Sequence, residues 1–250
     1  MWLKAVTAGG VSEVSSVVSV TPTAAPSGNV YTSPSVTSSN VTIVAQSPFS
    51  GDASGNSYSF NGTDTFLNVV SDDSWDFGTG DFTIEWFQYQ TDNNSFTRIF
   101  AIGSTPSTVS MQCSIESGIF YAWFSNAISF GTITPYKDEW VHFAIVRRST
   151  NLSIYKNGTR IFLPAINTTN ISNSLPLYFG VEDNPNNTIK PRTYFGGYLT
   201  NIRIVKGLAV YTGNFTRPTS ALTLTAAANP YDGSNTVAIP SGFTKLLFVP

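Results

Sequence analysis

The stretch Asp138-Glu-Trp-Val-His-Phe-Ala-Ile-Val-Arg-Arg-Ser-Thr-Asn-Leu-Ser-Ile-Tyr-Lys-Asn-Gly158 combines the densest strand pattern and the clearest turn signal of the chain. Residues 140–146 are mainly apolar on both alternating faces, which predicts a strand that is covered on both sides. Arg147 and Arg148 predict that this strand then emerges into water. Asn157-Gly158 supplies the positive-φ pair of a type I′ turn, so the stretch predicts a three-stranded antiparallel meander.

The composition of the whole chain agrees with an all-β protein. Of its 250 residues, 11% are charged and 14% are aromatic, a mixture that suits strands joined by polar turns. No segment has a convincing amphipathic helix pattern, and one β-sandwich can reach this length as a single domain. The formal net charge is −2 and basic clusters are lacking, so we expect no nucleic-acid partner.

Further strand patterns recur at short intervals on both sides of this meander. They occupy residues 58–60, 66–69, 82–87, 98–102, 109–115, 119–124, 128–133, 175–181, 198–205 and 244–249. The last of these strands is expected to lie near the first strand of the domain. Cys113 is the one cysteine, and its apolar strand predicts a small buried side chain rather than a nucleophile.

The chain divides into residues 1–46, an extended or partly disordered arm, and residues 47–250, the β-sandwich. The first part is rich in Ser, Thr, Val and Pro and lacks the large apolar residues of a core. Its β-branched residues favour an arm that orders on the sheet of a partner, and a disordered leader is the alternative. We expect neither a secretory signal nor a membrane insertion, because no long apolar segment is found.

Two oxygen-rich loops are candidate calcium sites. The first loop surrounds Trp75 with Asp72, Asp73 and Asp76, and the second contains Asp183. Carboxylate oxygens are suitable calcium ligands, although the spacing is not that of an EF-hand. The alternative is that these residues form local turns and caps.

Four motifs together resemble the laminin G-like branch of the concanavalin A-like lectin/glucanase superfamily. They are Gly80-Asp-Phe-Thr-Ile-Glu-Trp86, Trp140-Val-His-Phe-Ala-Ile-Val146, Leu152-Ser-Ile-Tyr-Lys-Asn-Gly158 and Gly197-Tyr-Leu-Thr-Asn-Ile-Arg-Ile-Val-Lys-Gly207. The resemblance covers about residues 56–249 and implies a jelly-roll sandwich of two antiparallel sheets, often with a sugar or calcium site at its loop rim. Residues 206–220 are also similar to virion proteins of aquatic viruses, notably marine phages.

The resemblance does not extend to the catalytic residues of the family's glucanases, which use a Glu-x-Asp-x-x-Glu run. Glu85 has Phe87 two residues on, where that run needs Asp, so we expect no enzyme activity. His142 is the one histidine and lies in an apolar strand, which indicates a structural role. One histidine and one cysteine are also too few ligands for a zinc site of the usual His and Cys type.

Two functions of different classes follow from these observations. The first is a virion structural protein of a capsid decoration, tail or fibre, assembled in the host cytoplasm and exposed on the virion surface. Its arm would contact other virion proteins or further copies in a homo-oligomer. The alternative is a lectin-like module that binds cell-surface glycans, for which the candidate residues are Trp75, Trp123, Asp183 and Asn184. Core packing of the tryptophans and turn formation by the polar residues are the structural alternatives.

Overall fold

The computed structural model confirms an all-β sandwich of two antiparallel sheets. It describes residues 34–49, 55–70, 73–92, 96–103, 111–124, 126–133, 136–162, 164–171, 175–181, 194–229 and 235–250. Within these residues, the one short helix is the 3-10 turn η1 (Asp73–Trp75). None of the described residues forms a helix with the length and apolar character needed to cross a membrane.

Sheet A contains seven of the described strands, in the order β1-β4-β14-β6-β7-β8-β9. Its strands are β1 (Val36–Ser39), β4 (Phe66–Val69), β6 (Phe96–Ile102), β7 (Met111–Glu116), β8 (Ile119–Phe124), β9 (Asn126–Thr132) and β14 (Leu177–Phe179).

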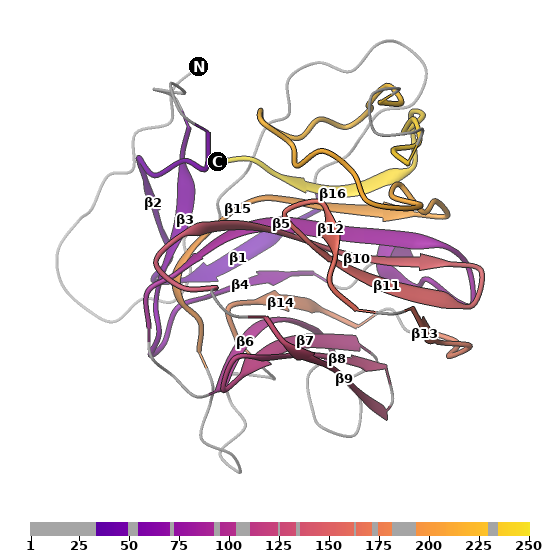
Figure 1. Cartoon of the computed structure of the whole chain (residues 1–250). Coiled ribbons are helices and arrows are strands. Elements are labelled where there is room, and N and C mark those ends of the chain that lie inside the picture. Colours follow the sequence, from indigo (N-terminus) through magenta and orange to yellow (C-terminus); the bar gives the residue numbers. More distant parts are fainter. Residues whose placement is uncertain are drawn as a thin grey trace, which may run out of the picture.

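Sheet B lies against sheet A and contains nine of the described strands (Figure 1). Its central order is β12-β11-β10-β5-β15-β3-β2, with β13 paired to β11 and β16 paired to β15. These strands are β2 (Thr42–Val44), β3 (Ser57–Asn61), β5 (Phe82–Gln90), β10 (Trp140–Arg148), β11 (Asn151–Lys156), β12 (Thr159–Arg160), β13 (Ala165–Ile166), β15 (Gly196–Lys206) and β16 (Thr244–Phe248).

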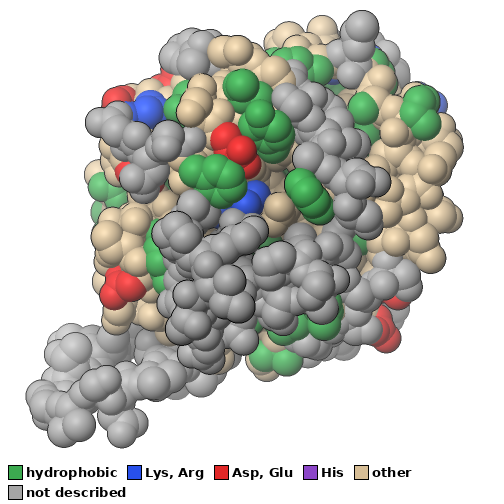
Figure 2. All heavy atoms as spheres, turned by 90° about the horizontal axis from the view of Figure 1, so that it is seen from below, with side chains coloured by type: hydrophobic (Ala, Val, Ile, Leu, Met, Phe, Trp, Pro, Cys, Tyr) green, Lys and Arg blue, Asp and Glu red, His purple; other side chains and the backbone are tan. Residues whose placement is uncertain are grey.

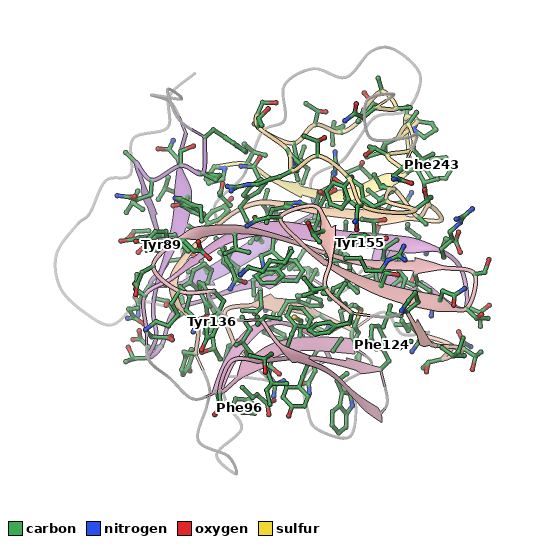
Figure 3. The ribbon with its side chains drawn as sticks, in the orientation of Figure 1. Tyr89, Phe96, Phe124, Tyr136, Tyr155 and Phe243 are labelled. Carbon is green, nitrogen blue, oxygen red and sulfur yellow. The ribbon has the colours of Figure 1, made fainter. Side chains whose placement is uncertain are left out.

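The main core fills the space between the two sheets. Sheet B contributes Trp86 and Phe143, whose rings stack at 5.7 Å, and sheet A contributes Phe100 and Cys113. Cys113 is fully buried, as predicted, and burial raises the pKa of its thiol well above the ordinary value. Figure 3 shows Phe124 between the sheets.

A third layer covers the outer face of sheet B. The described residues of the segment 207–243, called here the covering segment, pass over β10, β5 and β15 (Figure 1). They form a second apolar cluster in which Val210 and Tyr211 pack with Ala144, Val146 and Tyr155. This layer explains why both faces of β10 are apolar.

The structure confirms the predicted topology of the central meander, because β10, β11 and β12 are adjacent in sheet B. Asn157 and Gly158 have φ values of 50° and 82°, as a type I′ turn requires. The returning strand has only two residues, Thr159–Arg160. The last strand lies next to β3 along β15, and Phe248 contacts Tyr58.

Two predictions about exposure and boundaries differ from the structure. Arg147 does not emerge into water but is fully buried, because two loops fold over it. Residues 36–44, predicted as part of the arm, supply the edge strands β1 and β2 of the sandwich itself. Their β-branched residues therefore add strands to their own sheets, while residues 1–33 of the predicted arm lie outside the described residues.

Candidate functional site

Trp75 is a core residue and not a surface for sugar stacking, which corrects its assignment as a glycan contact. Its side chain is 0% exposed, and its indole Nε1 donates a hydrogen bond to the Leu175 carbonyl oxygen at 2.9 Å. The ring anchors η1 to the segment that precedes β14. The packing alternative therefore applies to this tryptophan.

The predicted calcium ligands are only partly described. Asp73 and Asp76 lie at the 3-10 turn, where the Asp76 amide donates to the Asp73 carbonyl oxygen at 3.2 Å. Asp72, Asp183 and Asn184 lie outside the described residues. Among the residues that the structure does describe, no three His, Cys, Asp or Glu side chains are grouped to hold a metal ion. Calcium binding stays a prediction.

Trp123 lies on the outer face of sheet A and is 37% exposed. Its strand β8 alternates strictly, with Phe120, Ala122 and Phe124 in the core. Tyr121 and Trp123 consequently point away from the core, two residues apart on one strand. An exposed tryptophan beside a tyrosine offers apolar ring surface to a ligand.

Polar side chains of β6 and β7 surround these two rings. The residues that point outward from β6, β7 and β8 are called here the Trp123 face, and they are Phe96, Arg98, Ala101, Gln112, Ser114, Glu116, Ile119, Tyr121 and Trp123. Seen from the sheet A side, hydrophobic side chains gather around neighbouring acidic and basic ones (Figure 2). Figure 3 shows Phe96 on this outer side of the sheet.

Gln112 carries an unused hydrogen-bond acceptor on the Trp123 face. It lies directly opposite Trp123 in the pairing of β7 with β8. Its side chain is only 7% exposed, and its Oε1 has no hydrogen-bond partner. A buried amide oxygen without a partner costs free energy of about 1–3 kcal/mol, so this position favours a ligand that donates a hydrogen bond.

The other polar groups of the Trp123 face are already engaged. The Ser114 hydroxyl donates to Glu116 Oε1 at 2.9 Å. The Arg98 guanidinium lies 4.6 Å from the centre of the Phe96 ring, a cation–π distance. The face therefore combines aromatic surface, an acceptor and both signs of charge within neighbouring strands.

A second polar cluster lies on the outer face of sheet B, beneath the covering segment. Glu85 Oε1 accepts hydrogen bonds from Arg203 Nε at 2.8 Å and from Arg203 Nη2 at 2.6 Å. Glu85 Oε2 lies 3.0 Å from His142 Nε2 and accepts a bond from the Tyr211 hydroxyl at 2.8 Å. All four side chains are buried, and Arg203 also donates to the Thr223 carbonyl oxygen.

The electrostatics of this cluster favour an ionised Glu85. Burial alone raises the pKa of the Glu85 carboxyl, but the Arg203 charge and the bonds from His142 and Tyr211 lower it from 4.5 to about 2. Burial lowers the pKa of His142 below 6.5, against the opposing effect of Glu85. The histidine is therefore neutral at pH 7, which makes Nε2–H the donor to Glu85.

The buried cluster holds layers together and does not face a substrate. Both oxygens of Glu85 are occupied by protein donors, and His142 is covered by Phe215 and Phe87. This agrees with the structural role predicted for His142. The sequence carried one signal for the cluster, since Glu85 and Arg203 each lie at an outward position of a strand that is otherwise largely apolar.

Arg147 is a further buried charged residue, and its structural role was not revealed by the sequence pattern. Its guanidinium donates to the carbonyl oxygens of Gly80 at 2.8 Å, Gly78 at 2.7 Å and Thr169 at 2.9 Å. It also contacts Asn167 Oδ1 and lies over the Phe82 ring. One buried cation thus connects the loop before β5 with the loop after β13.

A comparison with known proteins identifies the family to which the chain belongs. The family described as "Concanavalin A-like lectin/glucanases superfamily" matches residues 61–209. No curated protein sequence matches the chain. The fold can nevertheless be compared with solved structures.

The chain is also similar to three solved structures at low sequence identity. The enzymatically active domain of tailspike protein 2 of bacteriophage CBA120 has a TM-score of 0.57 at 11% identity, covering 89% of this chain and 34% of the tailspike. Domain 4 of AbnA, an extracellular arabinanase of Geobacillus stearothermophilus in complex with arabinotriose, has a TM-score of 0.48 at 14% identity, covering 68% of this chain and 83% of that domain. A Trypanosoma rangeli sialidase mutant has a TM-score of 0.49 at 12% identity, covering 70% of this chain and 28% of the sialidase. Of these three, the tailspike domain has a TM-score above 0.5, and at 11% identity its likeness concerns the fold alone.

Proposed function

We propose that this chain, which belongs to the concanavalin A-like lectin/glucanases superfamily, is a non-enzymatic virion structural protein that adheres to surface glycans through the Trp123 face. It would be a component of a capsid decoration, a tail or a fibre. The family contains both lectins and glucanases by its description, so the choice between binding and hydrolysis rests on this chain's own residues.

One observation carries the glycan part of the proposal: exposed Trp123 lies directly opposite the unpartnered amide oxygen of Gln112. A pyranose ring has an apolar C–H face, which can stack on an indole, and hydroxyl groups at its edge. A hydroxyl above the Trp123 ring could donate to Gln112 Oε1, and the adjoining Tyr121 widens the aromatic surface.

The environment of Glu85 favours binding of a glycan over its hydrolysis. Retaining glycoside hydrolysis needs two carboxyl groups about 5 Å apart on either side of the scissile bond. Glu85 is buried and bonded through both oxygens, and Glu116 accepts a hydrogen bond from Ser114. Glu85 therefore cannot serve as a catalytic carboxylate, and Phe87 stands two residues after it where the glucanase run needs Asp.

The virion part of the proposal rests on the resemblance of residues 206–220 to virion proteins and on the composition of residues 1–33. That segment is rich in Val, Ser and Thr, which suits pairing with the sheet edge of a neighbouring protein. A phage tailspike shares the fold, and this likeness is compatible with the proposal without supporting it further. The proposed location is the virion surface.

Glycan binding is tested by a glycan array with the wild-type protein, W123A and Q112L, each with and without a chelator. We expect W123A to lose about tenfold or more in affinity, because stacking on an exposed aromatic ring is removed. An effect of the chelator would reveal calcium. Absence of binding by the wild-type protein in both conditions would refute the adhesion role.

The virion role is tested by deleting residues 1–33, which leaves the edge strands β1 and β2 intact. We expect the truncated protein to remain folded but to be lost from purified particles. A wild-type protein that binds glycans and never copurifies with particles would instead indicate the alternative, a free lectin-like adhesion module. Incorporation of the truncated protein at the wild-type level would contradict the role of the arm.

A further inference from the structure

Two glutamines of β5 point into the core between the two sheets. Side chains two residues apart on a strand share a face, and Trp86 on this face packs against Phe100 of sheet A. Gln88 and Gln90 continue the same face, and both are 0% exposed. Tyr89 lies between them in the strand and marks their position in Figure 3. An apolar core therefore contains two primary amides at one end of β5.

The orientation of the Gln88 amide is fixed by Trp86. The indole Nε1 of Trp86 donates a hydrogen bond to Gln88 Oε1 at 2.8 Å. An indole nitrogen can only donate, so the amide atom that faces it must be the oxygen and the amide cannot be flipped. Gln88 Nε2 is therefore a donor that points elsewhere, and it has no hydrogen-bond partner among the described residues.

The orientation of the Gln90 amide is fixed from the other side. Gln90 Nε2 donates to Asp92 Oδ1 at 2.9 Å and to Thr97 Oγ1 at 3.2 Å. An ionised carboxylate can only accept, so the amide atom that faces Asp92 must be the nitrogen. Gln90 Oε1 is consequently an acceptor, and within the part of the chain that the structure describes it too is left without a partner.

One small molecule can satisfy both amides. Burying a polar group without a partner costs free energy, which is why such groups normally bond to protein or to ordered water. The Cα atoms of Gln88 and Gln90 are about 6.6 Å apart, as for any two residues at this spacing on a strand, so a single bridging molecule has the right size. It must accept from an N–H group and also donate to a carbonyl oxygen. A metal cation cannot accept and a halide cannot donate, whereas water does both.

We propose that the interior of the sandwich binds one water molecule between Gln88 Nε2 and Gln90 Oε1. The water completes a hydrogen-bond chain in which every donor points the same way. Trp86 donates to Gln88, and Gln88 donates to the water. The water donates to Gln90, which donates to the carboxylate of Asp92. This site lies in the core and does not depend on the function proposed for the Trp123 face.

The direction of the chain explains why a water is favoured at this position. Hydrogen bonds that point the same way polarise and strengthen one another, and a charged acceptor at the end strengthens the last bond. The Asp92 carboxylate also accepts from the Gly196 amide at 2.6 Å. Thr97 belongs to β6 of sheet A, and Gly196 belongs to β15 of sheet B. The completed chain would therefore hold the two sheets together at this end of the core.

The test in solution uses the full chain with ¹⁵N-labelled side-chain amides and water itself as the probe. A long-lived bound water gives cross peaks to nearby protons that have opposite signs in laboratory-frame and rotating-frame cross-relaxation spectra, whereas proton exchange gives the same sign in both. We expect peaks of opposite sign at the Gln88 NH₂ protons. The indole proton of Trp75 is the internal control, because it is buried and bonded to the Leu175 carbonyl oxygen, and it should show no such peak.

Matched variants count the water. Gln88→Met removes the donor with little change in side-chain length, so ¹⁷O relaxation dispersion should detect about one long-lived water fewer than in the wild-type protein. Gln46→Met makes the same change at an exposed position and should leave the number unchanged. An unchanged number in a folded Gln88→Met protein would overturn the proposal.

A high-resolution crystal structure of the wild-type protein decides the question even if Gln88→Met does not fold. We expect electron density for one water within about 2.7–3.2 Å of both Gln88 Nε2 and Gln90 Oε1. Density that reaches neither atom, or two amides that bond directly to protein groups, would contradict the site. Gln88 protons that show exchange peaks alone in solution would contradict it as well.

Discussion

Arg203 donates two hydrogen bonds to a single oxygen of Glu85, from Nε at 2.8 Å and from Nη2 at 2.6 Å, although the two residues are 118 positions apart. The pair joins the central strands β5 and β15 and lies under the covering segment. Tyr211 and Thr223 of that segment bond to the same pair. The ion pair therefore connects sheet B to its third layer.

Removing one member of this ion pair should be much more harmful than removing both. Glu85→Gln or Arg203→Met leaves a buried charge without its partner, and we expect each to lower the free energy of unfolding by about 3–5 kcal/mol. The double variant removes both charges and should cost less than the two single changes added together. Urea unfolding of all four proteins measures this coupling, and simple additivity would contradict it.

Stability should fall as the pH falls, in two separate ranges. Folding lowers the pKa of His142 below 6.5, so the unfolded chain gains a proton first, and stability decreases as the pH drops below about 6.5. Folding lowers the pKa of Glu85 from 4.5 to about 2, so a second decrease follows between those values. Unfolding by urea at a series of pH values should reveal both ranges.

His142→Gln isolates the first of these ranges. The variant keeps an amide donor that can reach Glu85 but has no group that titrates near pH 6.5. We expect its stability to be nearly constant between pH 7.5 and pH 5.5, unlike that of the wild-type protein. An unchanged pH slope in the variant would mean that other groups cause the acid sensitivity.

The local features of the fold were predictable from the sequence, and the burial of charges was not. The Asn157-Gly158 turn and the strand before it depend on neighbouring residues, and the structure confirms both. The burial of Arg147 depends on carbonyl groups of two loops that are distant in the sequence. One loop lies 67 to 69 positions before Arg147 and the other lies 22 positions after it, so no local pattern shows these contacts. The prediction of exposure is therefore wrong for Arg147 and confirmed for Arg148.

The tryptophans show the same limit for the candidate site. Trp123 lies in a strand whose residues are all apolar or aromatic. The sequence therefore could not show which side chains of this strand point into the core and which point outward. Pairing with β7 decides this and places Gln112 opposite the indole. Trp75 has polar neighbours in the sequence yet is buried, because its indole reaches a carbonyl group 100 positions away.

Arg147→Lys should destabilise the loops next to β5. A lysine ammonium cannot reproduce the forked geometry with which the guanidinium reaches the carbonyl groups of Gly78, Gly80 and Thr169. We expect the free energy of unfolding to fall by at least about 2 kcal/mol, since buried carbonyl oxygens lose their donors. Arg148→Lys is the control, because Arg148 is exposed and should tolerate the change.

Gly158→Ala should disturb the contact between the turn and the covering segment. Gly158 has φ 82°, and a Cβ there would lie 2.0 Å from the Phe215 carbonyl oxygen. Gly62 has a similar φ of 76°, but the nearest atom to its Cβ would be 3.5 Å away. Both alanine variants carry a left-handed backbone cost of about 1–2 kcal/mol. Thermal unfolding should show a clearly larger loss for Gly158→Ala, and equal losses would refute the role of close approach.

Trp75 and Trp123 should respond in opposite ways to the same substitution. Trp75→Ala removes a fully buried ring and its hydrogen bond to Leu175, so we expect a loss of about 3–5 kcal/mol in the free energy of unfolding. Trp123→Ala removes a ring that is 37% exposed, so its effect on stability should be much smaller. If the Trp123 face binds glycans, this second variant loses affinity while remaining folded. A large loss of stability in Trp123→Ala would instead assign that ring a packing role and remove the observation on which adhesion rests.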